Sequence, residues 1–286
     1  MRYATLTVVC GRRASGKTNK TLTALYKAVH NGRKVLIADF MDEFGNYIYR
    51  PGDPAHAIKP IFLKDVLRFT VQTKPEIVRI RPFHDNGVRM SNNEKQEALY
   101  KILKTYRNGI LLVEDVNVYI SDNAPNDIIG SLATLRQAGV DLIMHYQLIQ
   151  KAANPKILGM ANYIRLHKTN DEVARFKDRF LDKTDIMTVA QIIVNNRYKY
   201  GHSKNVNDET GKYFSVTVDI YSNKIRGIFT KEEAHYAVEE FISKNAAITI
   251  NQELLRKDRH GKKIYSSYQQ AYENIETQMM QDFFMF

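Results

Sequence analysis

The chain has 286 residues, 44% of them hydrophobic, which is enough for a sizeable core and excludes a disordered chain. Its 42 Lys and Arg residues exceed 31 Asp and Glu; the net charge of +11 indicates a polyanionic partner such as nucleic acid, unless the protein is simply basic. Cys10 is the only cysteine, which excludes an intrachain disulfide or a cysteine-based zinc site and favours a reducing cytoplasm. No apolar run approaches ~18 residues and no secretion signal opens the chain, so we expect no transmembrane helix.

Residues 11–18 match the phosphate-binding pattern G-x-x-x-x-G-K-[ST] at every specified position. They lie between an apolar strand predicted over 6–10 and a helix predicted over 18–29, as this chemistry requires; a chance glycine-rich turn is the alternative. The glycines let backbone N–H groups face a polyphosphate, and the helix N-terminus adds positive potential. The predicted nucleotide-binding residues are Gly11, Arg12, Arg13, Ala14, Ser15, Gly16, Lys17, Thr18 and Asn19.

Within this loop, Lys17 and Thr18 carry the specific chemistry. We expect Lys17 to reach the β- and γ-phosphates of ATP and the Thr18 hydroxyl to hold Mg²⁺. Because the loop should be exposed, we predict that Lys17 lies outside the core and is not needed for folding.

A second strand is predicted over residues 33–40, after the helix stop at Asn31-Gly32. A β-α-β unit of this size implies parallel strands joined by a right-handed crossover. Asp39 follows the apolar residues of this strand, at the edge where parallel sheets gather ligands. Asp39 therefore lies either near the nucleotide or its metal, or in a polar loop that caps the next element.

The next segment predicts a proline-rich loop over 49–60, a short helix over 62–69 and a strand over 77–80. Ser91-Asn92-Asn93-Glu94 has the pattern of a capping box and begins an amphipathic helix that runs to about Tyr106. Its apolar stripe indicates core packing.

Residues 109–115 (GILLVED) form the Walker B pattern, an apolar strand that delivers two carboxylates to the phosphate edge. One acid would hold the Mg²⁺ shell and the other would polarise the attacking water. By register, Glu114 takes the metal position and Asp115 the catalytic one. Many such ATPases have the order Asp-Glu, and because Asp115 is the shorter acid the two roles could be exchanged.

After a helix predicted over 127–137, a further strand over 140–147 ends in Gln147. Gln147 either senses the γ-phosphate and orients water or is an ordinary polar end of a strand. Arg136, at the end of the preceding helix, either reaches a neighbouring subunit's phosphate as an arginine finger or is solvated.

Residues 154–160 predict a helix, and 163–166 a last core strand. Residues 195–212 are basic, polar and turn-rich, and predict an exposed loop that contacts nucleic acid or forms a solvated hairpin. We divide the chain into an ATPase domain over 1–245 and a basic, helical tail over 246–286. The apolar end of that tail either docks on a neighbour or packs down.

The order of these motifs resembles the FtsK/HerA superfamily of P-loop ATPases, which holds DNA translocases, viral genome-packaging ATPases and the zonula-occludens-toxin-like assembly proteins of filamentous phages. The residues that carry the resemblance span roughly 1–170. They are GRRASGKTNKT at 11–21, DFMDEFGNY at 39–47, LLVED at 111–115, LRQAGVDLIMHYQ at 135–147 and ANYIRLHK at 161–168.

This resemblance implies an α/β fold of the RecA/ASCE-like P-loop class, with a mostly parallel sheet flanked by helices and a C-terminal helical appendage. It implies a homo-oligomeric ring, hexameric or pentameric, with ATP and Mg²⁺ at subunit interfaces and nucleic acid, DNA above all, in the pore. It also implies roles for Lys17, Thr18, Glu114 and Asp115, with Gln147 as sensor and Arg136 as finger. The cytoplasm, that of the host if the protein is viral, is the expected location, with virion association and a capsid vertex or portal as further expectations.

The resemblance favours a soluble genome-packaging motor, because the toxin-like branch usually carries a transmembrane segment after its ATPase domain. A soluble relative of the phage extrusion ATPases is the first alternative. A small-molecule P-loop kinase and a scaffold that binds ATP with negligible hydrolysis are the others; the acid pair that ends the apolar strand favours hydrolysis over the kinase.

Overall fold

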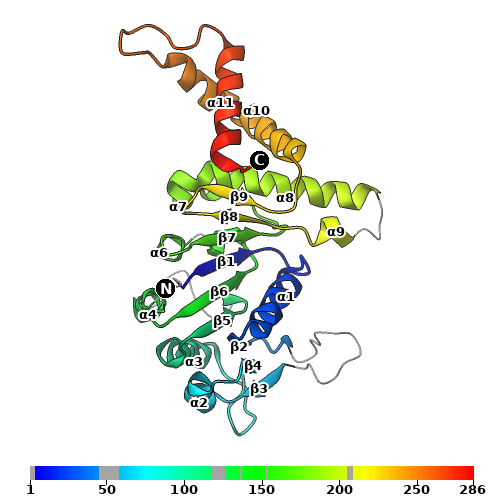
Figure 1. Ribbon diagram of the computed structural model, residues 1–286, viewed down its shortest axis with the longest axis vertical. Coiled ribbons are helices and arrows are strands. Elements are labelled where there is room, and N and C mark those ends of the chain that lie inside the picture. The colour runs from blue at the N-terminus through cyan, green and yellow to red at the C-terminus, as the bar shows by residue number, and fades with distance from the viewer. Residues whose placement is uncertain (1–3, 45–57, 117–125, 136, 153, 205–208) are drawn as a thin grey trace. The chain divides into compact units, whose positions relative to one another are not determined.

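The computed structural model describes residues 4–44, 58–116, 126–135, 137–152, 154–204 and 209–286 (Figure 1). The chain divides into two compact units, Met1–Asp171 and Glu172–Phe286. The predicted division at 245/246 differs from this one, because residue 246 lies inside the helix α10 (Lys231–Leu255). That helix continues past the expected end because Ile250, further along it, is fully buried.

The described part of the first unit contains a parallel sheet. Its strands are β1 (Leu6–Cys10), β2 (Lys34–Ala38), β3 (Lys59–Ile61), β4 (Ile77–Ile80), β5 (Gly109–Val113), β6 (Val140–Tyr146) and β7 (Tyr163–Leu166). They are arranged in the order β3-β4-β2-β5-β6-β1-β7, as Figure 1 shows. Neighbouring strands in this order are parallel, so their carboxyl ends lie at one edge. The predicted P-loop α/β class is confirmed.

Helices follow most of these strands. They are α1 (Lys17–His30), α2 (Val66–Val71), α3 (Asn92–Thr105), α4 (Asn126–Thr134), α5 (Ile149–Ala152) and α6 (Pro155–Leu158). The capping box predicted at Ser91 is formed, since its side chain accepts from the Glu94 amide and the Glu94 carboxylate accepts from the Ser91 amide. Each such cap satisfies backbone groups that would otherwise lack partners at a helix end.

The core that positions the P-loop forms where α1 packs on the sheet. Leu22 and Leu25 of α1 belong to one buried cluster with alternate residues of β2 and β5, among them Val35, Ile37 and Leu112. Alternation places these side chains on one face of the sheet, because successive strand residues point to opposite faces. This packing fixes the direction of α1 and therefore the position of its N-terminus.

The second unit is mainly helical. Its longer elements are α8 (Thr184–Lys204), the antiparallel strands β8 (Val216–Asp219) and β9 (Lys224–Arg226), α10 and α11 (Tyr268–Phe283). Short helices are α7 (Lys177–Phe180) and α9 (Glu209–Lys212). No helix in the described ranges combines the length and apolar character needed to cross a membrane.

The prediction of an exposed loop over 195–212 is wrong for most of that range, because α8 extends to Lys204 and α9 covers 209–212. The polar sequence stays helical because residues distant along the chain hold it. Asn196 donates to Glu240 (3.1 Å), and Arg197 donates to both carboxylate oxygens of Glu233, one of them at 2.8 Å. Both acceptors belong to α10, so a tertiary contact overrides the local preference for a loop.

The C-terminal aromatic residues divide between the two expected arrangements. Phe283 and Phe284 are buried, and the Phe284 ring lies edge-on to Phe229 at 5.8 Å. Met285 and Phe286 are exposed, although the Phe286 ring also contacts Phe229 at 6.1 Å. The tail therefore packs down on the unit as far as Phe284.

A buried lysine joins β2 to α2. Lys34 Nζ donates to the carbonyl oxygens of Phe69 (3.3 Å) and Gln72 (3.0 Å), and to that of Thr70. These carbonyls lie at the C-terminal end of α2, where a cation complements the helix dipole. Lys34 is thus a cap supplied from the sheet.

We expect Lys34→Met to lower the free energy of unfolding by about 1–3 kcal/mol, because the apolar side chain leaves these carbonyl groups without a donor. Chemical denaturation measures the change. Lys101→Met on the exposed side of α3, outside the last turn of that helix, is the control and should change stability by no more than ~0.5 kcal/mol. Equal effects of the two substitutions would contradict the capping role.

Candidate nucleotide site

The P-loop joins β1 to α1 through a turn that only certain residues tolerate. Ala14 has φ 59° and Gly16 has φ 83°, both in the left-handed region. A Cβ added at Gly11 would lie 2.6 Å from both Ser15 Oγ and His167 Cβ, so a side chain there would push the loop off the sheet. The glycines therefore allow the loop to close tightly over the end of β1.

The Lys17 side chain folds back across the loop. Its Nζ donates to the carbonyl oxygens of Gly11 (2.6 Å) and Arg12 (3.1 Å). The residue is only 7% exposed, so the prediction that Lys17 lies outside the core is wrong. Burial lowers the pKa of Lys17, and the nearby Glu114 and Asp115 oppose that shift. These carbonyls are partners that a phosphate can replace.

The remaining predicted binding residues lie around this loop. Arg13 is exposed and forms a long ion pair with Glu43 (3.4 Å), while the Arg12 amide donates to the Lys168 carbonyl. Ser15 is buried, and Asn19 is exposed on the first turn of α1. Arg13 and Asn19 are therefore accessible to a ligand.

Glu114, the first acid after β5, lies directly beneath the start of α1. Thr18 Oγ1 donates to Glu114 Oε1 at 3.0 Å. The other carboxylate oxygen of Glu114 pairs with His145 Nδ1, and His145 Nε2 lies 2.9 Å from Thr21 Oγ1. Burial raises the pKa of Glu114, but the charge of His145 and the hydrogen bonds from His145 and Thr18 outweigh it, and the net shift is downward. Glu114 is therefore held as a carboxylate.

Asp115, the second acid, faces a different partner. Gln147 Nε2 donates to Asp115 Oδ2 at 2.8 Å. The backbone of Asp115 has φ 45°, in the left-handed region. Burial and the negative charge of Glu114 raise the pKa of Asp115. The two acids are thus separated into two environments.

The pair Thr18 and Glu114 has the chemistry of a Mg²⁺ site. A hydroxyl and a carboxylate oxygen lie 3.0 Å apart, and both are the hard oxygen ligands that Mg²⁺ prefers. Glu114 is nearly fully buried and keeps its charge, so a cation at its oxygens would gain a strong partner. The residues present therefore fit the ion that the motif implies.

Two histidines complete the site, and the sequence did not assign a role to either. His145 on β6 joins Glu114 to Thr21, and His167 after β7 lies under the P-loop with its Nδ1 2.9 Å from the Ser15 carbonyl. A carbonyl can only accept, so Nδ1 carries the proton. The signal for His145 was its place near the carboxyl end of β6, at the edge where parallel sheets gather ligands.

His167 supports the P-loop from below. It is 1% exposed, and burial lowers its pKa to about 3, so it stays neutral. We expect His167→Ala to weaken ATP binding threefold to tenfold, because the Ser15 carbonyl loses a hydrogen bond worth about 1 kcal/mol. Binding of a fluorescent ATP analogue measures this. His167→Asn, whose amide offers an N–H near the place of Nδ1, should recover part of the affinity; no difference between the two variants would contradict the role.

The sequence left two positions open for Asp39, one near the nucleotide or its metal and one in a polar loop that caps the next element. The structure supports the second. It is fully buried; its oxygens accept from Arg79 (2.7 Å) and from the backbone amides of Glu43 (2.8 Å) and Phe44 (3.1 Å). Burial raises the pKa of Asp39 to about 6 and outweighs these hydrogen bonds. Asp39 therefore caps the turn after β2 rather than facing a nucleotide.

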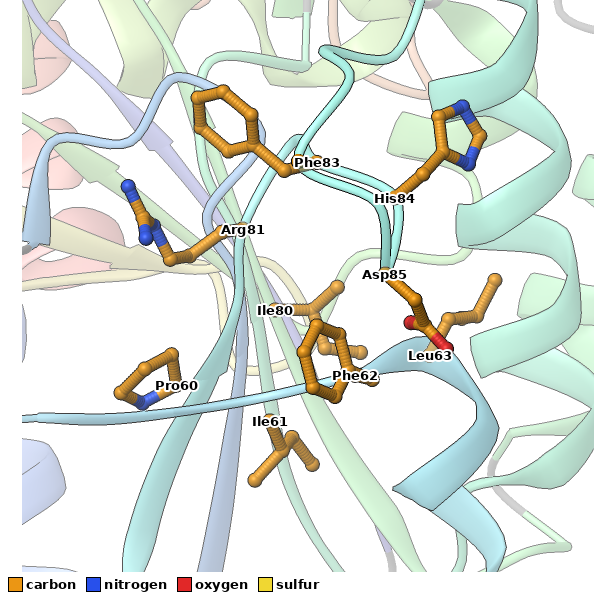
Figure 2. Close-up of a pocket in the computed structure, with 10 residues that line it drawn as sticks. Pro60, Ile61, Phe62, Leu63, Ile80, Arg81, Phe83, His84 and Asp85 are labelled. Atoms are coloured by element: carbon orange, nitrogen blue, oxygen red, sulfur yellow. The ribbon is translucent and has the colours of Figure 1, made fainter.

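A cavity of about 460 Å³ lies at the far edge of the sheet, at the ends of β3 and β4. Figure 2 shows Phe62 and Phe83 on its walls together with Arg81. Arg81 is held by both oxygens of Asp42 and lies 4.8 Å from the Phe83 ring centroid. Strands β2, β5 and β6 separate this edge from β1, so the cavity is not part of the phosphate site.

Of the predicted catalytic residues, Lys17, Glu114, Asp115 and Gln147 lie at the same edge of the sheet, at the ends of β1, β5 and β6 and the start of α1. Arg136 lies outside the described residues. Its expected role as a finger stays a prediction.

Comparison with known proteins found similar solved structures, while no protein-family model and no curated protein matches the chain. One is the genome packaging NTPase B204 from Sulfolobus turreted icosahedral virus 2 in complex with ATP-γS, at 16% identity and a TM-score of 0.47, covering 79% of this chain and 97% of that one. Another is the N-terminal domain of zonular occludens toxin from Neisseria meningitidis, at 14% identity and a TM-score of 0.35, covering 59% and 79%. These are two of the kinds of protein that the order of motifs resembles.

Proposed function

We propose that this chain hydrolyses ATP with Mg²⁺ and uses the energy to move nucleic acid, as a genome-packaging motor built as a ring. The observation that carries the ATPase part is the division of the two acids: Glu114 beside the P-loop hydroxyl of Thr18, and Asp115 beside Gln147. A site that only binds a nucleotide needs a phosphate cradle and a metal ligand. A site that also activates water needs a second carboxylate, separate from the metal ligand and here paired with an amide donor.

The residues divide the work as follows. Lys17 exchanges its carbonyl partners for the β- and γ-phosphates, and Thr18 and Glu114 hold Mg²⁺, which neutralises phosphate charge when bound. Asp115 accepts a proton from the attacking water, and Gln147 keeps the carboxylate and the water aligned. The raised pKa of Asp115 brings it closer to that of a base that works near neutral pH.

The nucleic-acid part rests on charge. The net charge of +11 favours a polyanion, and DNA is the expected track. One of the similar structures is named as a genome packaging NTPase, and we propose genome packaging for this chain as well.

The test is steady-state ATP hydrolysis by the full chain, alone and with double-stranded DNA, single-stranded DNA or RNA. We expect one polymer to stimulate hydrolysis, and stimulation to fall as salt rises, because phosphate contacts release counterions. Hydrolysis that is indifferent to all three would contradict the nucleic-acid motor and leave the ATPase. No hydrolysis under any of these conditions would contradict both.

The trans role of Arg136 is tested by mixing subunits. We expect Arg136→Ala to lower hydrolysis and keep nucleotide binding, and a small share of that variant to inhibit wild-type rings. Activity that falls only in proportion to the share of variant would contradict a finger that acts across a subunit interface.

A further inference from the structure

The second unit holds a group of metal-ligating side chains far along the sequence from the P-loop. His235 and Glu239 lie four residues apart on α10, which places them on one face of the helix, and Glu276 lies on α11. We propose that these three residues bind a divalent transition-metal ion, for which Zn²⁺ is the natural probe, and that the ion holds α11 against α10. The proposal is independent of the proposed function.

The distances suit three ligands of one ion. His235 Nε2 lies 3.2 Å from Glu276 Oε1, and the other ring nitrogen, Nδ1, lies 3.7 Å from Glu239 Oε1; a single ion takes only one of these two nitrogens as its ligand. One ligand atom from each residue lies within 4.8 Å of the other two. Around a tetrahedral Zn²⁺ with bonds of about 2.0–2.2 Å, ligand atoms are ~3.4 Å apart. Rotation of the half-exposed His235 and Glu239 side chains is enough to close the difference.

Glu276 gives a second observation. Its side chain is only 15% exposed, and Oε1 is shielded from solvent. Although Oε1 lies 3.2 Å from His235, it accepts no well-directed hydrogen bond from any described residue. A shielded carboxylate oxygen whose nearest donor group is poorly directed is costly, and a bound cation lowers that cost.

The local charge also calls for a cation. Glu239 and Glu276 place two carboxylate oxygens within 4.8 Å of each other, and among the described residues His235 is the one ion-pair partner of either. Burial and the negative charge of Glu276 and Glu239 raise the pKa of the nearby Tyr272. One imidazole and two carboxylates are a mixed set that suits Zn²⁺ and similar ions better than Ca²⁺.

A cavity beside the group leaves room for the remaining ligand. It has a volume of about 460 Å³ and is lined by His235 and Glu276 together with Lys231, Met280 and Phe284. Three protein ligands leave a fourth tetrahedral position, which water or a small anion can fill from this cavity. The same cavity borders Phe284, so the ion lies close to where the C-terminal tail packs down.

The experiment uses the full chain, treated with EDTA, dialysed and free of nucleotide. Titration calorimetry with Zn²⁺ alone should show one equivalent that His235→Asn and Glu276→Gln each weaken at least tenfold. His30→Asn, an exposed histidine on α1, is the matched control and should leave that equivalent unchanged. Any Zn²⁺ held at the P-loop acids appears equally in all variants and is thereby separated.

Stability gives the second readout. At Zn²⁺ a hundredfold above its Kd, the wild-type melting temperature should rise by roughly 5–10 °C, and in EDTA the variants should melt within a few degrees of wild type. If Glu276→Gln fails to fold, the half-exposed His235→Asn still decides the case. The proposal would be overturned if Zn²⁺ did not bind, or if neither substitution changed its binding. It would also be overturned if acidification raised the melting temperature while Zn²⁺ did not.

Discussion

Lys17→Ala should lower the rate of ATP hydrolysis by a factor of about 10²–10³ or more, the largest loss expected from any substitution in the P-loop. The ammonium group of Lys17 is a cation that the loop can offer to the γ-phosphate as charge develops there. Its present partners, the carbonyl oxygens of Gly11 and Arg12, show that Nζ already lies over the loop where the phosphates would bind. Steady-state phosphate release measures the loss.

We expect Lys17→Ala to leave the fold in place. The reason is not that Lys17 is exposed, as the sequence predicted, but which groups its hydrogen bonds reach. Lys17 is buried, but its two hydrogen bonds go to a loop and not to a strand or helix, so its removal costs about 1 kcal/mol for each. Circular dichroism should be unchanged and the melting temperature only a few degrees lower. Lys27→Ala, on the exposed side of the same helix, controls for the loss of one positive charge. Hydrolysis that survives Lys17→Ala, or falls as far in Lys27→Ala, would contradict the assignment.

The sequence predicted the elements whose signals are local. The strands that lead to the P-loop and to Glu114 are short apolar runs, and the structure places them at 6–10 and 109–113 as β1 and β5. Ser91 and Glu94 form their cap within four residues. In each case the residues that determine the structure are neighbours in the chain, so no tertiary information is needed.

Features that depend on which strands are neighbours were beyond the sequence. His145 contacts Glu114 because β6 pairs with β5, and His167 reaches Ser15 because β7 pairs with β1. Predicting these contacts needs both the strand order and the direction of each side chain. With only one of the two, the histidines would be interpreted as ordinary core residues. The prediction of a loop over 195–204 failed for the same reason, because the residues that hold this helix, Glu233 and Glu240, lie far along the chain on α10.

The order of the two acids remained open in the sequence, and substitution at each position decides it. We expect Asp115→Asn to retain ATP and Mg²⁺ binding but to lower hydrolysis by a factor of about 10²–10⁴, because the amide cannot accept the proton of the attacking water. Asparagine is the right replacement, since it tolerates the left-handed backbone at φ 45° and its amide oxygen can still accept from Gln147.

Glu114→Gln is the matched variant and should fail at a different step. The amide keeps a shape that Thr18 can still contact but loses the negative charge, so we expect the Mg²⁺-dependent part of ATP affinity to fall while affinity without Mg²⁺ changes little. Binding of a fluorescent ATP analogue, with Mg²⁺ and with EDTA, separates the two variants. If Asp115→Asn instead loses the Mg²⁺ dependence and Glu114→Gln binds normally without turnover, the roles are exchanged. In that case the contact between Thr18 and Glu114 does not mark the metal position, since a carboxylate that binds the ion cannot lose its charge without weakening Mg²⁺-dependent affinity.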